Sequence, residues 1–248
     1  MSPKTATIII PTLNEEKGIG ETIRSLPLRA LRDIGYNSEV IVVDSESSDL
    51  TREIANSLGA KVVSESRRGY GRALKTGLQC ATGEIVVTLD GDATYPAELI
   101  PEYLNLIQEQ NLDFITVNRF SAMDNGAMSL SHYIGNKMLS LVMRVLYSVN
   151  VTDSQSGMWI MRKRFVEQMY VTSDNMSFSE EIKIVAFKFF KAAEVKGTYF
   201  KRVGKPKLQT FSHGWHNLKF LLSYRYDMSA ANRKPTQLIV NKESKRSC

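Results

Sequence analysis

The amino-acid sequence predicts an α/β fold in which helices flank an open, mostly parallel central sheet. Short β-branched apolar runs alternate with helical patterns along the first half of the chain, as in consecutive strand-helix-strand units. Pro11, Asp44 and Asp90 directly follow three of these runs. The length of 248 residues suits one large α/β domain or a domain with an appendage, and the 43% hydrophobic and 23% charged content excludes a disordered or fibrous protein.

The expected strands are rich in Val, Ile and Thr, which is typical of strands buried in a parallel sheet. They cover residues 7–10, 39–43, 61–64, 84–89 and 113–117. The helices expected between and after them cover residues 19–26, 49–58, 71–81 and 97–110. Asp49 is the expected N-cap of the second helix, and Pro96 precedes the fourth.

The second half of the chain is less regular. A long helix, a polar turn, a short apolar stretch and a further helix are expected at residues 129–149, 153–157, 158–161 and 179–191. No internal repeat or low-complexity linker divides these segments.

Positive charge is concentrated at the C-terminal end. The chain has 32 Lys and Arg against 26 Asp and Glu, a net +6. Residues 196–248 contain 12 basic and 2 acidic side chains, a local +10, which leaves residues 1–195 with 20 basic and 24 acidic side chains, a net −4. We therefore expect a domain over residues 1–210 and a basic extension over residues 211–248. Such an extension indicates a polyanionic partner: phosphate, a membrane surface or nucleic acid.

The hydrophobic pattern predicts no membrane-spanning helix. The most apolar longer stretch, residues 138–149, contains Arg144 and is shorter than the about 20 residues that a spanning helix needs. The N-terminus lacks the features of a secretory signal, and the two cysteines have no disulfide-framework spacing. We expect a cytoplasmic protein that lies on the cytoplasmic face of a membrane as a peripheral protein.

Acidic and amide side chains follow three of the expected strands. Pro11-Thr-Leu-Asn-Glu15 follows the first, Asp44 the second and Asp90-Gly-Asp92 the fourth. Ligands of open parallel sheets bind outside the carboxyl ends of the strands, so these residues would share one crevice, with Asp44 placed to bind a ribose hydroxyl. The glycine-rich dinucleotide and P-loop motifs are missing, so side chains and a metal ion are expected to hold a nucleotide.

Asp90 and Asp92 are the candidate metal ligands. Two carboxylates at a strand end form the hard oxygen cluster that suits Mg²⁺ or Mn²⁺, and Gly91 between them allows a diphosphate to approach closely. Such an ion would offset negative charge on a departing nucleoside diphosphate. The alternative is a solvated acidic turn, because Asp-Gly is common in turns.

Six motifs occur in an order that resembles one enzyme family. They are Pro11-Thr-Leu-Asn-Glu15, the Asp44 strand end, Gly69-Tyr-Gly-Arg-Ala73, Asp90-Gly-Asp-Ala-Thr-Tyr-Pro96, Asp153-Ser-Gln-Ser-Gly157 and Arg202-Val-Gly-Lys-Pro-Lys-Leu208. The set resembles the family 2 inverting glycosyltransferases, and most closely their dolichyl-phosphate mannose or glucose synthases. The resemblance implies a GT-A fold, a nucleoside diphosphate sugar donor, a Mg²⁺ or Mn²⁺ cofactor and a polyprenyl (dolichyl) phosphate acceptor.

The resemblance also implies roles for single residues. Binding of the base and ribose is implied for Pro11, Asn14, Glu15 and Asp44. Binding of ribose and metal is implied for Asp90 and Asp92, a place near the phosphates for Arg119, and a place near the donor sugar for Asp153. Thr94 stands where this branch often has glutamine, and His132 lies near where mannose synthases can have arginine, so neither is assigned a role.

The choice of acceptor decides which catalytic residues are needed. A sugar hydroxyl needs a general base, whereas a lipid phosphate is already an anion at pH 7 and needs cations instead. Arg202 and Lys207 match the ends of a basic family motif, and with Asp92 and Arg119 they are the expected catalytic residues. The alternative for the basic residues is a solvated surface.

Two other functions stay open from the sequence. Glu180 or Glu181 could be the base of a transferase that acts on a glycan hydroxyl, although acidic residues are also stabilised in the first turn of any helix. A nucleic-acid-binding module is disfavoured because the aromatic RNA-binding motifs are missing. Residues 215–228 could form a helix with an apolar side, either on anionic lipid or packed on the protein itself. The predicted function is therefore metal-dependent, inverting transfer of a hexose from a GDP-mannose or UDP-glucose type donor to a polyprenyl phosphate.

Overall fold

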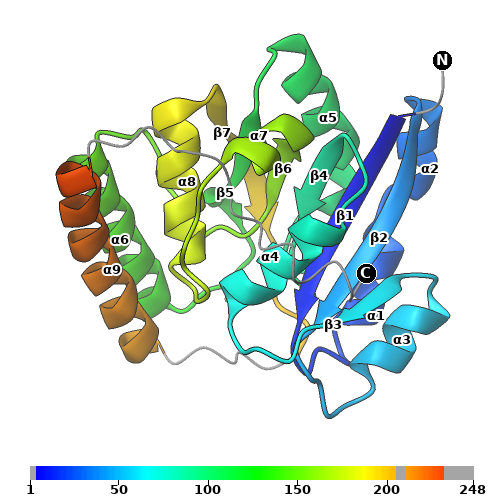
Figure 1. Cartoon of the computed structure of the whole chain (residues 1–248). Coiled ribbons are helices and arrows are strands. Elements are labelled where there is room, and N and C mark those ends of the chain that lie inside the picture. The colour runs from blue at the N-terminus through cyan, green and yellow to red at the C-terminus, as the bar shows by residue number, and fades with distance from the viewer. Residues whose placement is uncertain (1–3, 205–209, 232–248) are drawn as a thin grey trace.

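The computed structural model describes residues 4–204 and 210–231, with side chains for 4–204 and 214–226. At its centre lies a seven-stranded sheet with the order β3-β2-β1-β4-β6-β5-β7 (Figure 1). The strands are β1 (Lys4–Thr12), β2 (Tyr36–Asp44), β3 (Lys61–Ser64), β4 (Ile85–Thr88), β5 (Phe114–Met123), β6 (Trp159–Arg162) and β7 (Ala192–Tyr199). Neighbours pair in parallel except at β6, which is antiparallel to both β4 and β5. The expected mostly parallel sheet is confirmed.

The helices connect these strands and cover the two faces of the sheet. They are α1 (Ile19–Ser25), α2 (Leu28–Asp33), α3 (Thr51–Ser57), α4 (Tyr70–Cys80), α5 (Ile100–Glu109), α6 (Leu130–Tyr147), α7 (Lys163–Gln168), α8 (Phe178–Phe189) and α9 (Thr210–Ala231). A single 3-10 turn, Ala97–Leu99, leads into α5.

Alternation along the strands builds two hydrophobic layers. Ile8 and Ile10 of β1 are fully buried on one face, in a cluster with residues of α1, α3 and α5. Ile9, between them, is buried on the other face with residues of α4, α7 and α8. Side chains of a strand point alternately to opposite faces, so β1 contributes to both layers and must lie in the middle of the sheet.

Four features of the fold differ from the sequence expectation. The apolar stretch at 158–161 forms strand β6, and β7 follows the last expected helix. Helices α2 and α7 were also not expected, and each has 6 residues, which is too short to show a helical period. These four elements are defined by their contacts in the folded protein and not by a pattern in the sequence.

Two local expectations are corrected by small shifts. Arg119 was expected just past the fifth strand, but β5 continues to Met123, so Arg119 lies within it. Asp49 was expected as an N-cap, but α3 begins at Thr51. The carboxylate Oδ1 of Asp49 still accepts a hydrogen bond from the backbone N–H of Thr51, 3.1 Å away, so its local role resembles that of a cap.

Helices α6 and α9 lie side by side at the edge of the molecule beyond α8 (Figure 1). Their contact is a third hydrophobic cluster, in which Met143, Tyr147 and Leu221 are buried. The hydroxyl of Tyr147 donates to the backbone carbonyl of Leu221, 2.5 Å away. Residues 205–209, which precede α9, lie outside the described chain, and the domain boundary at residue 210 stays a prediction. Across the described ranges, no helix combines the length and hydrophobicity needed to cross a bilayer.

The topology brings the strand-end residues together. The chain runs from β1 to β2 and β3 on one side and returns to β4 on the other side of β1, so the strand order reverses beside β1. Thr12 pairs with Asp44 at the carboxyl ends of β1 and β2, and Leu89 donates its backbone N–H to Ile9 beyond β4. Such a reversal creates a crevice at the carboxyl ends of the strands.

Candidate active site

Asp92 lies in the crevice, four residues after the end of β4, and is almost completely buried. The hydroxyl of Thr94 donates to its Oδ1 at 2.7 Å. Ala93, between them, has a φ of 59°, a left-handed conformation that lets the chain turn back on Asp92. Thr94 therefore orients Asp92, which is the role that the structure shows for it.

Asp90 is held by groups of α4 and of the 153–157 loop. The hydroxyl of Tyr70, the first residue of α4, donates to its Oδ1 at 3.0 Å. Gly157 is packed against the same carboxylate, because a Cβ built on this glycine would lie 3.1 Å from Oδ1 of Asp90. Burial and the negative charge of Asp92 raise the pKa of Asp90 to about 6, although Arg202 opposes the shift.

Arg202 joins the start of the basic region to this pair of aspartates. Its Nη2 lies 2.5 Å from Oδ2 of Asp92, and its Nη1 lies 3.6 Å from Oε1 of Glu15. The backbone N–H of Val203 also donates to the carbonyl of Asp92. Burial alone would lower the pKa of Arg202, but Asp92 and Asp90 raise it, so the side chain stays a cation. Lys205 and Lys207 lie outside the described residues.

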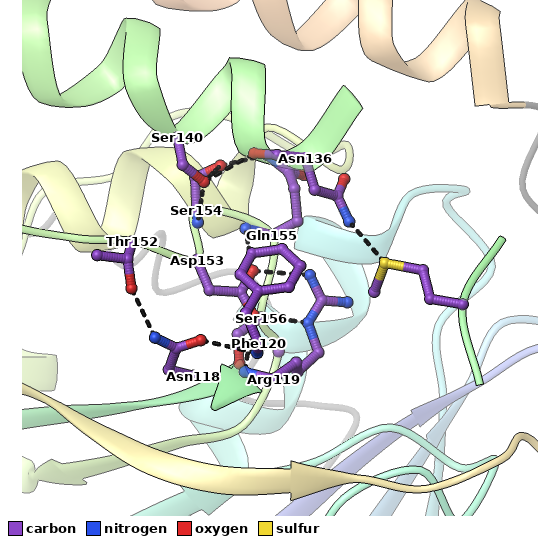
Figure 2. Close-up of polar contacts among 12 residues, drawn as sticks. Asn118, Arg119, Phe120, Asn136, Ser140, Thr152, Asp153, Ser154, Gln155 and Ser156 are labelled. Carbon is purple, nitrogen blue, oxygen red and sulfur yellow. Dashed lines mark hydrogen bonds and ion pairs between the residues drawn. The ribbon is translucent and has the colours of Figure 1, made fainter. Parts of the chain in front are cut away.

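Arg119 and Asp153, both expected at the site, bind each other (Figure 2). Nε and Nη2 of the guanidinium donate to Oδ2 and Oδ1 of Asp153, each at 2.8 Å, and the backbone N–H of Arg119 donates to Oδ2. Asp153 is fully buried, and Arg119 is 8% exposed. Burial would raise the pKa of Asp153, but the guanidinium lowers it below its ordinary value. The pair fixes the direction in which the guanidinium points.

The loop at residues 153–157 is held by groups that the sequence did not single out. Nζ of Lys183, fully buried in α8, donates to the carbonyls of Ser154 and Ser156 at 2.8 and 2.6 Å. Glu194 of β7 accepts hydrogen bonds from the backbone N–H groups of Thr152 and Asp153. A lysine and a glutamate in ordinary elements carry no sequence signal for this role, because only their burial reveals it.

Gln155 connects this loop to two helices. The side-chain N–H of Gln155 donates to Oε1 of Glu180 at 2.7 Å. The side-chain oxygen of Gln155 accepts a hydrogen bond from the side-chain N–H of Asn217, in α9, at 2.8 Å. The hydroxyl of Ser140 in α6 donates to Ser154 (Figure 2). The loop is thus fastened to α6, α8 and α9 at once.

Glu180 and Glu181 are both completely buried in the first turn of α8. Glu181 accepts from the backbone N–H groups of Thr172 and Ser173, each at 2.8 Å, and from the Thr172 hydroxyl. Burial raises the pKa of both carboxyls. Both oxygens of Glu181 are engaged with the 172–173 segment, which is a structural role.

The first two strand ends are joined to each other. The backbone N–H of Asn14 donates to the Ser47 hydroxyl, and the Asn14 side chain accepts from the backbone N–H of Ser48. Asn14 has a φ of 54°, which asparagine tolerates better than most residues. Pro11 is the last residue but one of β1 and pairs with Val43 of β2. This arrangement places Pro11, Asn14 and Glu15 beside the end of β2.

Asp44 ends β2 and is fully buried. Its Oδ2 pairs with Arg52 and accepts the backbone N–H of Ser47 at 3.0 Å. Its Oδ1 is buried and accepts no hydrogen bond from the part of the chain that the structure describes. A buried carboxylate oxygen without a donor is costly, so it is well suited to receive a donor from a ligand.

His132 lies in the first turn of α6. Burial lowers its pKa, and the positive charges of Arg119 and Arg202 lower it further. The backbone N–H of His132 donates to Ser129, the N-cap of α6. The N-terminus of α6 therefore lies close to the cationic part of the site.

Within the described residues, no cluster of three or more His, Cys, Asp or Glu side chains could hold a metal ion. Asp90 and Asp92 nevertheless fit a divalent ion that is shared with a substrate, because Mg²⁺ usually takes one or two carboxylates and completes its shell with phosphate oxygens and water. Among the described residues, Oδ2 of Asp92 accepts no aligned hydrogen bond, although Nη2 of Arg202 lies 2.5 Å from it. A bound ion would share this oxygen with Arg202.

This sheet order, with an aspartate pair after β4 at the reversal of the strand order, is that of the GT-A class of glycosyltransferases. The chain belongs to glycosyl transferase family 2, whose model matches residues 7–170. The expected fold and family are confirmed.

Several curated and solved proteins are similar to this chain. Low-salt glycan biosynthesis hexosyltransferase Agl6 of Haloferax volcanii is 33% identical over 221 residues, 88% of this chain and 53% of that protein. The dolichyl-phosphate hexose transferase of the same organism is 31% identical over 210 residues, 84% of this chain and 88% of that protein. Glucosyl-3-phosphoglycerate synthase of Mycobacterium tuberculosis, solved with Mn²⁺, UDP-glucose and phosphoglyceric acid, has a TM-score of 0.70 at 22% identity, covering 90% of this chain and 80% of that one. The chain thus spans about half of Agl6, and its likeness to the synthase is one of fold.

Proposed function

We propose that this glycosyltransferase moves a hexose from a nucleoside diphosphate sugar to a polyprenyl phosphate, with inversion at the anomeric carbon. The observation that carries the proposal is the position of Arg202, which pairs with Asp92 and Glu15 at the site. A cation here is suited to bring an anionic acceptor to an anionic donor. The similarity to a dolichyl-phosphate hexose transferase over most of both chains supports the same acceptor.

The reaction needs no proton acceptor. An oxygen of the lipid phosphate forms a bond to the anomeric carbon while the bond from that carbon to the nucleoside diphosphate breaks, and the electron pair leaves with the diphosphate. Attack from the opposite side converts an α-linked donor into a β-linked lipid phosphate sugar. Two anions must approach each other, so their repulsion is the main electrostatic cost.

Different residues of the site would bind the donor and the acceptor. Asp44, with Pro11, Asn14 and Glu15, is suited to hold the base and ribose at the ends of β1 and β2. Arg119 is oriented by Asp153 near the donor phosphates and sugar. Arg202, and Lys207 beyond the described residues, would hold the acceptor phosphate.

Asp90 and Asp92 would hold a Mg²⁺ or Mn²⁺ ion, and such an ion offsets negative charge on a leaving diphosphate. Tyr70 and Thr94 orient the two carboxylates. The M. tuberculosis synthase, which has this fold, was solved with Mn²⁺.

The competing function is transfer to a glycan hydroxyl with Glu180 or Glu181 as base. Both residues are completely buried, and Glu181 is fully engaged by Thr172 and Ser173. Glu180 is hydrogen-bonded to Gln155, so burial and this contact both separate it from solvent. The conservative variants Glu180→Gln and Glu181→Gln distinguish the two functions. We expect both to keep most of the transfer rate, whereas loss of about a hundredfold or more in either variant would favour the hydroxyl acceptor.

The direct test is a donor panel with a polyprenyl phosphate acceptor and Mg²⁺ or Mn²⁺. GDP-mannose, UDP-glucose and UDP-N-acetylglucosamine each carry the ribose and diphosphate that the site would bind. We expect one of them to give a β-linked lipid phosphate sugar, and Asp92→Ala to reduce that rate by about a hundredfold or more. Unchanged transfer by Asp92→Ala would refute the metal assignment.

A further inference from the structure

The surface of α6 that faces away from the protein is unusually apolar. Five of its large hydrophobic side chains are exposed, with exposed fractions from 50 to 73%: Leu130, Ile134, Met138, Leu141 and Val145. They are spaced four, four, three and four residues apart. At ~100° per residue this spacing places all five within an arc of about 80° on one side of the helix. The opposite side, with Met143 and Tyr147, is buried in the contact with α9.

Helix α9 has a similar exposed row. Trp215, Leu222 and Tyr226 are 57, 55 and 76% exposed and are spaced seven and four residues apart, on one side of the helix. Leu221 is buried against α6 instead. Packing on the protein is thus observed for one side of α9, and the lipid alternative for the 215–228 segment stays a prediction. We call the five exposed side chains of α6 the apolar edge; the row on α9 is a separate exposed apolar surface.

The charge of these two helices is positive. Helix α6 contains Lys137 and Arg144 and no acidic residue, and α9 contains Lys219 and Arg225 with Asp227 as its single acidic residue. Nζ of Lys219 lies 5.3 Å from the centre of the Trp215 ring. Exposed aliphatic groups with aromatic rings and lysine or arginine beside them are the composition of surfaces that enter the headgroup region of anionic bilayers.

A shallow, open depression of about 390 Å³ lies at the C-terminal end of α6. Leu141 and Val145 line it together with Arg144, so apolar side chains and a guanidinium share one depression. An arginine beside aliphatic groups is a combination that can pair with a lipid phosphate while acyl chains contact the apolar side chains.

The other end of α6 leads to the active site. Tyr133, in its first turn, packs edge-to-face on Phe120 with ring centres 5.2 Å apart, and Phe120 directly follows Arg119 in the chain. A membrane that covers α6 would therefore present a lipid phosphate next to the cations of the site.

We propose that the apolar edge of α6 is the surface by which this protein lies on an anionic lipid bilayer. The inference rests on the proposed function for the identity of the acceptor, but the surface itself rests on exposure, spacing and charge. A bilayer is favoured over a second copy of the chain because positively charged helices would repel their symmetry mates and attract anionic headgroups.

The test compares two double variants that change the charge equally. Met138→Glu with Val145→Glu alters the apolar edge, and neither new carboxylate lies three or four residues from Lys137 or Arg144. Ile34→Glu with Phe189→Glu alters exposed hydrophobic residues of other elements: Ile34 follows α2, which lies at the opposite end of the molecule from α6 and α9 (Figure 1), and Phe189 ends α8. All four side chains are exposed, so both variants should fold, which circular dichroism checks.

Binding is measured by cosedimentation with vesicles of phosphatidylcholine and phosphatidylglycerol, with pure phosphatidylcholine as the neutral comparison. We expect the wild type and the Ile34/Phe189 variant to bind the anionic vesicles, and the Met138/Val145 variant to bind about tenfold or more weakly. Equal binding by all three proteins would refute the proposal.

Two further measurements separate the possible failures. Transfer to a long-chain lipid phosphate in vesicles should fall in the Met138/Val145 variant, while transfer to a short, water-soluble polyprenyl phosphate should stay unchanged. A wild type that binds vesicles through this edge but transfers sugar to no lipid phosphate would refute the proposed function and leave the surface standing. A wild type that sediments as a dimer, becomes monomeric in the Met138/Val145 variant and ignores vesicles would show that a second copy covers the edge.

Discussion

Arg119 and Asp153 form a buried, two-pronged ion pair between β5 and the loop before β6, with both N–O distances at 2.8 Å. The two residues are 34 positions apart in the sequence, and each was expected at the site for separate reasons. Their contact means that neither acts alone: the carboxylate sets the direction of the guanidinium, and the guanidinium keeps the carboxylate ionised.

The first prediction concerns this ion pair. Removing one partner leaves a buried charge without compensation, which costs about 3 to 5 kcal/mol, whereas replacing both by apolar groups can be nearly neutral. We expect Asp153→Ala to lower the free energy of unfolding by about that amount, and the double variant Arg119→Met, Asp153→Leu to lose less. Urea denaturation measures both. Glu84→Ala, which breaks the exposed pair with Lys4, is the control and should cost no more than about 1 kcal/mol.

The second prediction concerns Thr94. Its hydroxyl donates to Oδ1 of Asp92, so Thr94→Val should leave the fold intact and let Asp92 rotate. We expect the rate of transfer to fall about tenfold, the order of magnitude for loss of one positioning hydrogen bond, with a higher metal concentration needed for half-maximal rate. Thr94→Ser keeps the hydroxyl and should be close to wild type. Similar rates for the valine and serine variants would contradict an orienting role.

The third prediction concerns the contact of Gly157 with Tyr70 and Asp90. A Cβ at residue 157 would overlap the Tyr70 hydroxyl, so Gly157→Ala should displace the side chain that holds Asp90. We expect binding of Mn²⁺ with a nucleoside diphosphate, measured by calorimetry, to weaken about tenfold or more. Adding Tyr70→Phe removes the overlapping oxygen and should restore part of the binding. No recovery in the double variant would show that the overlap is not the cause.

The fourth prediction is a pH dependence that arises from Lys183. Burial lowers the pKa of this lysine to about 7, below its ordinary value near 10.5. The unfolded chain therefore binds more protons than the folded chain between these two values, so the contribution of Lys183 to stability rises with pH across this window. Lys183→Met lacks this contribution. The difference in free energy of unfolding, wild type minus variant, should increase between pH 7 and 10 by at most ~1.4 kcal/mol per pH unit.

Urea denaturation at several pH values measures this slope. Lys188→Met, at an exposed position of α8, controls for the loss of a lysine from the helix. A constant difference between wild type and Lys183→Met across the window would contradict the prediction.

Much of the fold follows from the sequence because it depends on local pattern. The β-branched runs of β1 to β5 and the helical periods between them locate these elements to within a few residues, except at the end of β5, which continues to Met123. The length of the helical connections predicts that the strands they join are parallel. Strand β6 is not predicted from the sequence, because a run of four apolar residues is compatible with a strand or a helix. Its antiparallel direction is visible only in the assembled sheet, where β6 lies between β4 and β5 and pairs with both.

The candidate site divides in the same way. The sequence by itself determined the acidic strand ends, the order of the family motifs and the separation of a negative body from a positive C-terminal part, because these are properties of residue type and spacing. Only the tertiary structure decided that Arg119 binds Asp153, that Arg202 lies on Asp92, that Lys183 holds the 153–157 loop and that α6 exposes an apolar side. These contacts join residues far apart in the chain, and their strength comes from burial, which exists only after the sheet and its helices have assembled.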